Sequence, residues 1–188
     1  MNQDSEALRT EVRHVALGLV FCSFSLTLSI GIVVIDILPD LFGVLYFLTF
    51  LRRCRGEKLS WPLRLCGWYG VAYGISMLVQ WYRLIPAMQA FMERWGVLLW
   101  QICLLILLWY VFEGLIELSR QAGREDYVQS GLWFQRVLAV SQCLVIVVVF
   151  WQAHDLEGIA IVLSLLVRLA MAAYVSNSQV ILPQPETA

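Results

Sequence analysis

The chain has 188 residues, of which 60% are hydrophobic and only 14% are charged, and its mean hydropathy is +0.74. A soluble domain is about half apolar and about a quarter charged, so this composition favours one membrane domain. The net charge of -1 comes without a basic stripe, which argues against nucleic acid as a partner. The five cysteines are widely spread, and their spacing predicts neither a metal site nor a redox pair.

The first part of the chain combines a polar segment with a long apolar run. Residues 1–14 are mixed in charge, and we expect them to form a cytoplasmic N-terminal segment. The run 15–35 is longer than the roughly 7–15 apolar residues of a signal peptide, so it predicts a retained membrane span. Its polar residues alternate as in a strand, but the length of the run favours a helix in lipid: Ser23, Ser25, Thr27, Ser29.

A second arm follows at 39–53, and it is short. Its length of about 22 Å falls below the roughly 30 Å of a hydrocarbon core. It can cross if Arg52 and Arg53 extend their side chains to the interface and the bilayer thins locally. The alternative is a re-entrant hairpin that returns to the side from which it entered.

Four more apolar stretches predict spans at 63–82, 95–118, 132–151 and 158–175, and an amphipathic segment at 83–95 predicts an interfacial helix. The sequence thus predicts an all-α, polytopic bundle of about six transmembrane helices over 15–175, of which the first two form a hairpin. We expect the tail 176–188 to be disordered and cytoplasmic. Most Lys and Arg residues fall on the side of the termini, which predicts that both termini are cytoplasmic.

The stretch Ile35-Asp36-Ile37-Leu38-Pro39-Asp40-Leu41-Phe42-Gly43 resembles a pattern like I-D-x-L-P-D-F-I-G-Y. That pattern is typical of a group of small uncharacterised bacterial integral membrane proteins. Gly114 and the later Gly123-Arg124-Glu125-Asp126 are similar to that group too. The resemblance implies a multi-span bacterial membrane protein and implies no particular activity. We expect the chain in the bacterial cytoplasmic membrane.

Acidic residues occur at the first and the last of the predicted outer turns. Asp36 and Asp40 are four residues apart, which on a helix would place both carboxylates on one face. Near the start of the second arm, an acidic side chain can accept free backbone N–H groups, which predicts that these residues cap the helix. The alternative is a ligand site on the outer face that binds a cation and includes residues of the last turn: His154, Asp155, Glu157. Their spacing matches no zinc signature, and we expect neither a metal nor a cofactor.

Arg168 lies inside the sixth predicted span, where an unpaired arginine costs at least about 2.5 kcal/mol. Glu113 and Glu117, near the inner end of the fourth span, predict an ion pair with it. Such a pair can act as a structural clamp between two helices or as a relay for protons or substrate. Other polar residues of the spans are expected to hydrogen-bond between helices: Gln101, Ser141, Gln142.

Gly67, Gly70 and Gly74 place small residues along the third span, a pattern that lets another helix approach closely. We find no phosphate loop, nucleophile elbow or other recognisable catalytic set. The sequence therefore favours a non-enzymatic scaffold, sensor or accessory subunit whose partners are the bilayer and a membrane protein or second copy. The alternative is a small transporter or cation-binding protein that uses the carboxylates and Arg168.

Overall fold

The computed structural model describes most of the chain: residues 2–23, 27–30, 33–36, 40–55, 60–79, 85–151 and 154–178. In chain order, its elements are α1 (Asn2–Phe21), β1 (Thr27–Ile30), β2 (Val33–Asp36), α2 (Asp40–Arg55), α3 (Trp61–Val79), α4 (Pro86–Phe91), the π-helix η2 (Met92–Gly96), α5 (Val97–Gln121), α6 (Glu125–Trp151) and α7 (His154–Ser178).

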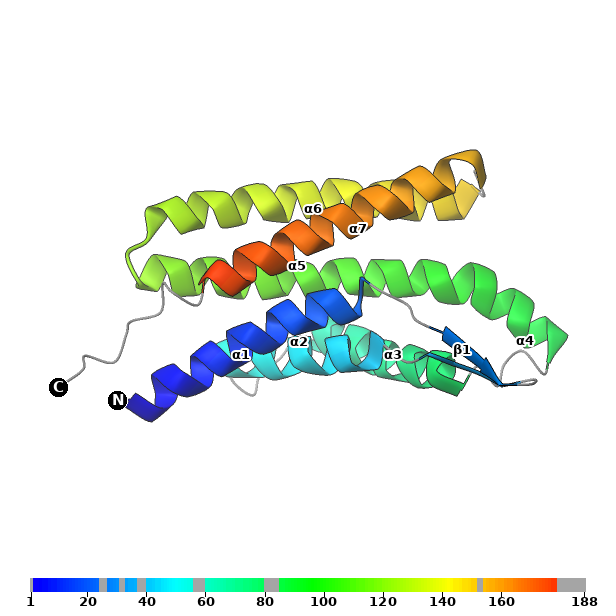
Figure 1. Ribbon diagram of the computed structural model, residues 1–188, viewed down its shortest axis with the longest axis horizontal. Helices are drawn as coiled ribbons and strands as arrows, with labels where there is room; N and C mark the ends of the chain where they lie inside the picture. The colour runs from blue at the N-terminus through cyan, green and yellow to red at the C-terminus, as the bar shows by residue number, and fades with distance from the viewer. Residues whose placement is uncertain are drawn as a thin grey trace.

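The long helices form a bundle around α5. This helix packs against α6 on one side and against α2 and α3 on the other, while α7 closes the bundle against α6 and α1 (Figure 1). Consecutive long helices run in opposite directions, so α1 begins and α7 ends at the same end of the molecule (Figure 1). We call this end the terminal end. Large buried side chains from α2 and α5 fill the centre of the bundle: Phe47, Phe50, Phe112, Leu104.

Three of the helices are long and apolar enough to cross a membrane: α5, α6 and the part of α7 from Gly158 to Asn177. These three helices suggest a membrane protein and agree with the last three predicted spans. The predicted number of six spans is not confirmed, because α1 begins with a charged segment and α2 has only 16 residues. The helical class of the bundle is confirmed, and the β-hairpin is an addition to it.

The predicted helical span at 15–35 is wrong. Helix α1 includes most of the polar N-terminal segment and ends at Phe21, and β1 then pairs with β2 in antiparallel fashion, with Thr27 opposite Asp36. Of the alternating polar residues, Thr27 and Ser29 lie in β1, so their alternation was a strand signal. The β-branched Val33, Val34 and Ile35 favour the partner strand. Length alone favoured a helix, but a hairpin also pairs the backbone groups of its two strands with one another.

The short second arm has a structural explanation. Helix α2 is about 24 Å long at 1.5 Å per residue, and α1 and α2 pack side by side. Where α1 ends and α2 begins, the Cys22 thiol donates to the backbone oxygen of Asp40 at 3.9 Å. The β-hairpin continues beyond this point along α3 (Figure 1). The sequence predicted two helices at 15–35 and 39–53. The structure instead has α1, the β-hairpin and α2 in this part of the chain.

The other boundaries shift by a few residues. The described part of the stretch predicted as 63–82 lies in α3, and the described part of 83–95 lies in α4 and η2. The span predicted as 95–118 corresponds to α5, which begins at Val97. Helix α6 begins at Glu125 instead of 132, because the polar residues expected in a connector form its first turns. Helix α7 extends the predicted span 158–175 at both ends, to His154 and Ser178. The rest of the predicted tail, 179–188, lies outside the described residues.

The glycines of α3 lie where this helix meets its neighbours, as their spacing indicates. A Cβ on Gly67 would lie 2.8 Å from Leu48, and one on Gly70 would lie 3.0 Å from Trp100. At Gly74 the added Cβ would lie 3.0 Å from both the Cα and the N of Leu41. Backbone atoms cannot move aside as a side-chain tip can, so Gly74 sets the distance between α3 and the start of α2.

We expect Gly74→Ala to lower the free energy of unfolding by about 1–3 kcal/mol, because the new methyl group overpacks a backbone contact. Thermal unfolding in detergent, followed by tryptophan fluorescence, measures this change. Gly158→Ala is the matched control, since nothing lies within 4 Å of its added Cβ and its backbone is helical. Equal melting temperatures for the two variants would contradict the close contact between α3 and α2.

Candidate functional site

Arg168 is the most deeply placed charge among the described residues. It lies ten residues after Gly158, or about 15 Å along α7, and thus near the middle of that apolar helix. Only 9% of its surface is exposed. A guanidinium at this depth is costly unless its N–H groups have acceptors inside the protein, so its contacts define the first candidate site.

The guanidinium joins three helices. Its Nη1 donates to the backbone oxygen of Cys22, just beyond the end of α1, and its Nη2 donates to Oε1 of Gln101 on α5 at 3.3 Å. The carbonyl groups at the C-terminal end of a helix have no N–H partners within that helix, and they form the negative end of its dipole. Arg168 therefore caps α1 from a helix that lies 146 residues away in the sequence.

Gln142 on α6 completes the cluster and is fully buried. Its amide oxygen faces Arg168, because the reverse orientation would place its NH2 group against guanidinium donors. In this orientation the oxygen accepts from Arg168 Nε at 3.0 Å, from Nη2 at 2.7 Å and from Ser164 Oγ at 3.0 Å. The NH2 group donates to Gln101 Oε1 at 3.0 Å. We call Arg168, Gln142, Gln101, Ser164 and the Cys22 carbonyl the central polar cluster.

Asp40 stands at the edge of this cluster, in the first turn of α2. Its carboxylate is close enough to interact electrostatically with both Arg168 and Cys22. A negative charge there also complements the positive end of the α2 dipole. The C-terminal end of α1 thus lies beside the positive Arg168, and the N-terminal end of α2 carries the negative Asp40. Each charge stabilises the helix end at which it lies. The expected role of Asp40 at the start of the second arm agrees with this position.

The predicted ion pair between Arg168 and Glu113 or Glu117 is wrong. Gln101, which Arg168 contacts, precedes Glu113 by 12 residues, or about 18 Å along α5. Helical side chains lean toward the N-terminus of their own helix, so Arg168 extends toward Ser164 and away from the glutamates. Glu117 instead accepts from Arg120 at 2.8 Å.

The two glutamates belong to a second candidate site, a pocket of about 480 Å³ at the terminal end. It lies between α1, α2 and α5, and we call it the terminal pocket. Its lining combines charged, polar and apolar side chains: Leu8, Arg53, Cys54, Glu113, Gly114, Glu117, Leu118, Gln121.

A third group of polar residues fixes the turn between α5 and α6. Gly123 has φ +69°, a left-handed conformation that suits glycine, and its N–H donates to Arg120 O at 3.0 Å. The Arg124 N–H donates to Ser119 O at 3.0 Å, which completes a Schellman motif at the end of α5. Arg124 O then accepts from the backbone N–H groups of Tyr127 and Val128, so α6 begins immediately.

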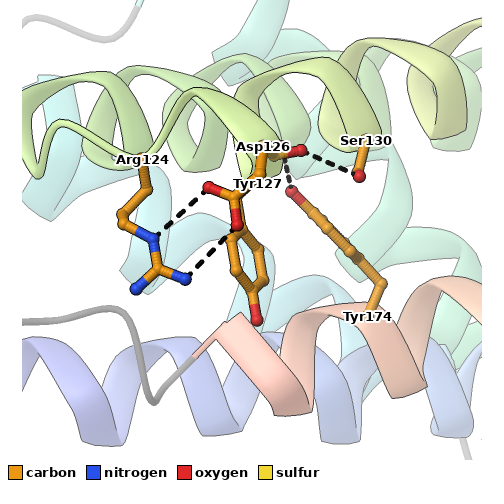
Figure 2. Close-up of polar contacts among 5 residues, drawn as sticks. All are labelled: Arg124, Asp126, Tyr127, Ser130 and Tyr174. Carbon is orange, nitrogen blue, oxygen red and sulfur yellow. Dashed lines mark hydrogen bonds and ion pairs between the residues drawn. The ribbon is translucent and has the colours of Figure 1, made fainter.

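Figure 2 shows how this turn attaches to the end of α7. The Arg124 guanidinium donates to both carboxylate oxygens of Asp126 at 3.3 Å and lies 5.2 Å from the centre of the Tyr127 ring. Tyr174 of α7 donates to Tyr127 O at 2.8 Å, and Ser130 donates to Asp126 O at 2.9 Å. The hydrogen bonds from Arg124 to Asp126 raise the pKa of the guanidinium above its usual value. These contacts indicate a structural role, in which the start of α6 is held against the end of α7.

Little of the outer ligand site that the sequence offers as an alternative falls within the described side chains. The side chains of its candidates lie outside the described residues, except that of Asp40: Asp36, His154, Asp155, Glu157. Within the described part of the chain, no group of three His, Cys, Asp or Glu residues could hold a metal ion.

Sequence reasoning found part of the central polar cluster. Gln101 and Gln142 form the expected hydrogen bonds between helices, while Ser141 bonds to Leu138 O within its own helix. Ser164 was not singled out, although it lies one turn before Arg168 on the same face. The Cys22 carbonyl could be recognised only once the end of α1 was known.

Comparisons with protein-family models, with curated proteins and with solved structures found no match to this chain. The resemblance to small bacterial membrane proteins therefore stays a prediction.

We expect Arg168→Met to lower the free energy of unfolding by about 3–5 kcal/mol, because it removes the donors that buried acceptors need. Arg168→Lys should recover only part of this loss, since a single ammonium group cannot reproduce the planar guanidinium fork. Thermal melts in detergent test both variants against Arg136→Met, an exposed arginine of α6. A melt of Arg168→Met that matches the control would contradict the capping role.

Proposed function

We propose that this chain is a multi-pass protein of the bacterial cytoplasmic membrane that acts as a non-enzymatic scaffold or accessory subunit. The observation that carries this proposal is the closed central polar cluster. Its side chains satisfy one another at the middle of the bundle, where a transporter would need groups that face a path for substrate. The described interior thus stabilises the bundle with its polar groups.

The outer surface of α6 and α7 supports placement in a membrane. Large apolar side chains are exposed along both helices, including Trp133, Val140, Trp151, Ile159 and Leu166. A soluble protein rarely exposes such an extended apolar surface, whereas lipid or the helix of a partner covers it without cost.

The distribution of positive charge supports the proposed orientation. Exposed arginines occur at or near the terminal end on several helices: Arg13, Arg52, Arg64, Arg120, Arg124. Because cytoplasmic loops are enriched in Lys and Arg, we place this end, and with it both termini, in the cytoplasm. In this arrangement α1, α2 and α3 accompany the three apolar helices in the bilayer, which retains the six-helix organisation as part of the proposal.

A small transporter is the second candidate, and one specific observation favours it. Helix α1 ends, and helix α2 begins, inside the bundle next to Arg168 and Asp40. Transporters often use such interrupted helices, whose charged ends bind ions or substrates near the middle of the membrane. The two functions differ in whether water reaches the central polar cluster.

Cys22 is a native reporter for this difference, because it is buried beside Arg168. We expect a variant that retains only Cys22 to resist charged, membrane-impermeant thiol reagents applied from either side of native membranes. Ser130→Cys in a cysteine-free background is the control, since Ser130 is exposed near the terminal end and should react from the cytoplasmic side. Rapid labelling of Cys22 would contradict the scaffold proposal and favour a transporter.

A further inference from the structure

A groove runs between α1 and α7 near the terminal end of the bundle, where the two helices pack side by side in opposite directions (Figure 1). Its volume is about 380 Å³, and its lining comes from both helices: Arg13, Ala16, Leu17, Val20, Ala172, Ser176. We call it the α1–α7 groove. Among the described residues that line it, Arg13 alone is charged, and the floor is mainly apolar. The lining therefore favours a molecule with an anionic end and an apolar body.

Arg13 and Ser176 lie at similar depths in the proposed membrane placement. Arg168 donates to the backbone oxygen of Cys22, and both lie near the middle of the apolar helix α7. Arg13 precedes Cys22 by nine residues, or about 14 Å along a helix, and Ser176 follows Arg168 at a similar distance of about 12 Å. Half of a hydrocarbon core is about 15 Å thick. The two polar residues are thus close to the level of the cytoplasmic headgroups, while Val20 lies about 10 Å deeper than Arg13.

The guanidinium of Arg13 has no partner within the described part of the chain. Its residue is exposed, and no hydrogen bond or ion pair joins it to another described residue. Other arginines at the terminal end are paired within the chain: Arg53 with Glu11, Arg120 with Glu117. At the level of the headgroups, a guanidinium attracts anionic lipids and fits the two free oxygens of a phosphate diester. The lipid can therefore supply the negative charge that the described chain does not place beside Arg13.

We infer that the α1–α7 groove binds an anionic phospholipid whose headgroup carries no ammonium. Arg13 donates to the phosphate oxygens, and the hydroxyl of Ser176 hydrogen-bonds to the headgroup. One acyl chain lies along Leu17 and Val20 toward the middle of the membrane. The inference rests on the proposed membrane placement, but not on whether the protein acts as a scaffold or a transporter.

This lining distinguishes among headgroups by their charge. Phosphatidylglycerol has a net negative charge, which Arg13 attracts. Phosphatidylethanolamine and phosphatidylcholine add a positive charge beside the phosphate, and the described lining has no carboxylate to accept it. Inorganic phosphate has the negative charge but no acyl chain to cover the apolar floor.

The test measures lipid binding to the full-length protein in detergent by native mass spectrometry. We expect phosphatidylglycerol to bind at least about fivefold more tightly than the other two lipids, a difference of about 1 kcal/mol. Arg13→Gln should reduce this preference to less than about twofold, whereas Arg13→Lys should retain most of it. Arg52→Gln is the matched control, because it removes an exposed arginine of the terminal end that does not line the groove. It should leave the preference unchanged.

Ser176→Glu tests the same site from α7, and it keeps the test decisive if Arg13→Gln does not fold. The new carboxylate should repel the phosphate and abolish the preference for phosphatidylglycerol. Asn177→Glu is its control, since Asn177 is also exposed but does not line the groove, and it should retain most of the preference.

Equal affinity for all three lipids would overturn the inference, as would a preference that survives both Arg13→Gln and Ser176→Glu. Inorganic phosphate that displaces phosphatidylglycerol at equal concentration would also overturn it, because the apolar floor would then contribute nothing. None of these outcomes depends on the labelling of Cys22, so the two proposals can fail separately.

Discussion

Backbone carbonyls at the end of a helix need hydrogen-bond donors, and inside an apolar bundle only the protein can provide them. Helix α1 ends in such a place, and Arg168 donates to the carbonyl of Cys22 at that end. The guanidinium in turn needs acceptors, which Gln101 and Gln142 provide from α5 and α6. The end of α1 inside the bundle thus accounts for buried polar residues on α5, α6 and α7.

The end of α1 at Phe21 also determines how the first part of the chain folds. Because α1 stops at Phe21, residues 27–30 and 33–36 can pair as strands along α3 instead of continuing the helix. Helix α2 starts at Asp40 next to that end, and Gly74 allows its first turn to touch α3. The terminal end is built differently, since its charges face outward and line an open pocket. The central cluster therefore stabilises the bundle from within, while the terminal pocket is open to the outside.

Composition and hydropathy were enough to predict the helical bundle, because α5, α6 and α7 follow the local apolar pattern closely. They failed at 15–35, where the length of the apolar run outweighed a genuine alternation of Ser and Thr. The burial cost of Arg168 was evident from the sequence, but its partner was not. That partner depends on the direction in which the side chain leans and on a helix end, and neither feature appears in a hydropathy pattern.

The partner of Arg168 is the central claim, and a double-mutant cycle on thermal or denaturant unfolding measures it most directly. We predict that Arg168→Met and Gln142→Leu are coupled by about 1 kcal/mol or more, because each removes the same interaction. Arg168→Met and Glu117→Gln should instead be additive within about 0.5 kcal/mol, since these residues share no contact. Additivity with Gln142 together with coupling to Glu117 would contradict the central polar cluster and support an ion pair in its place.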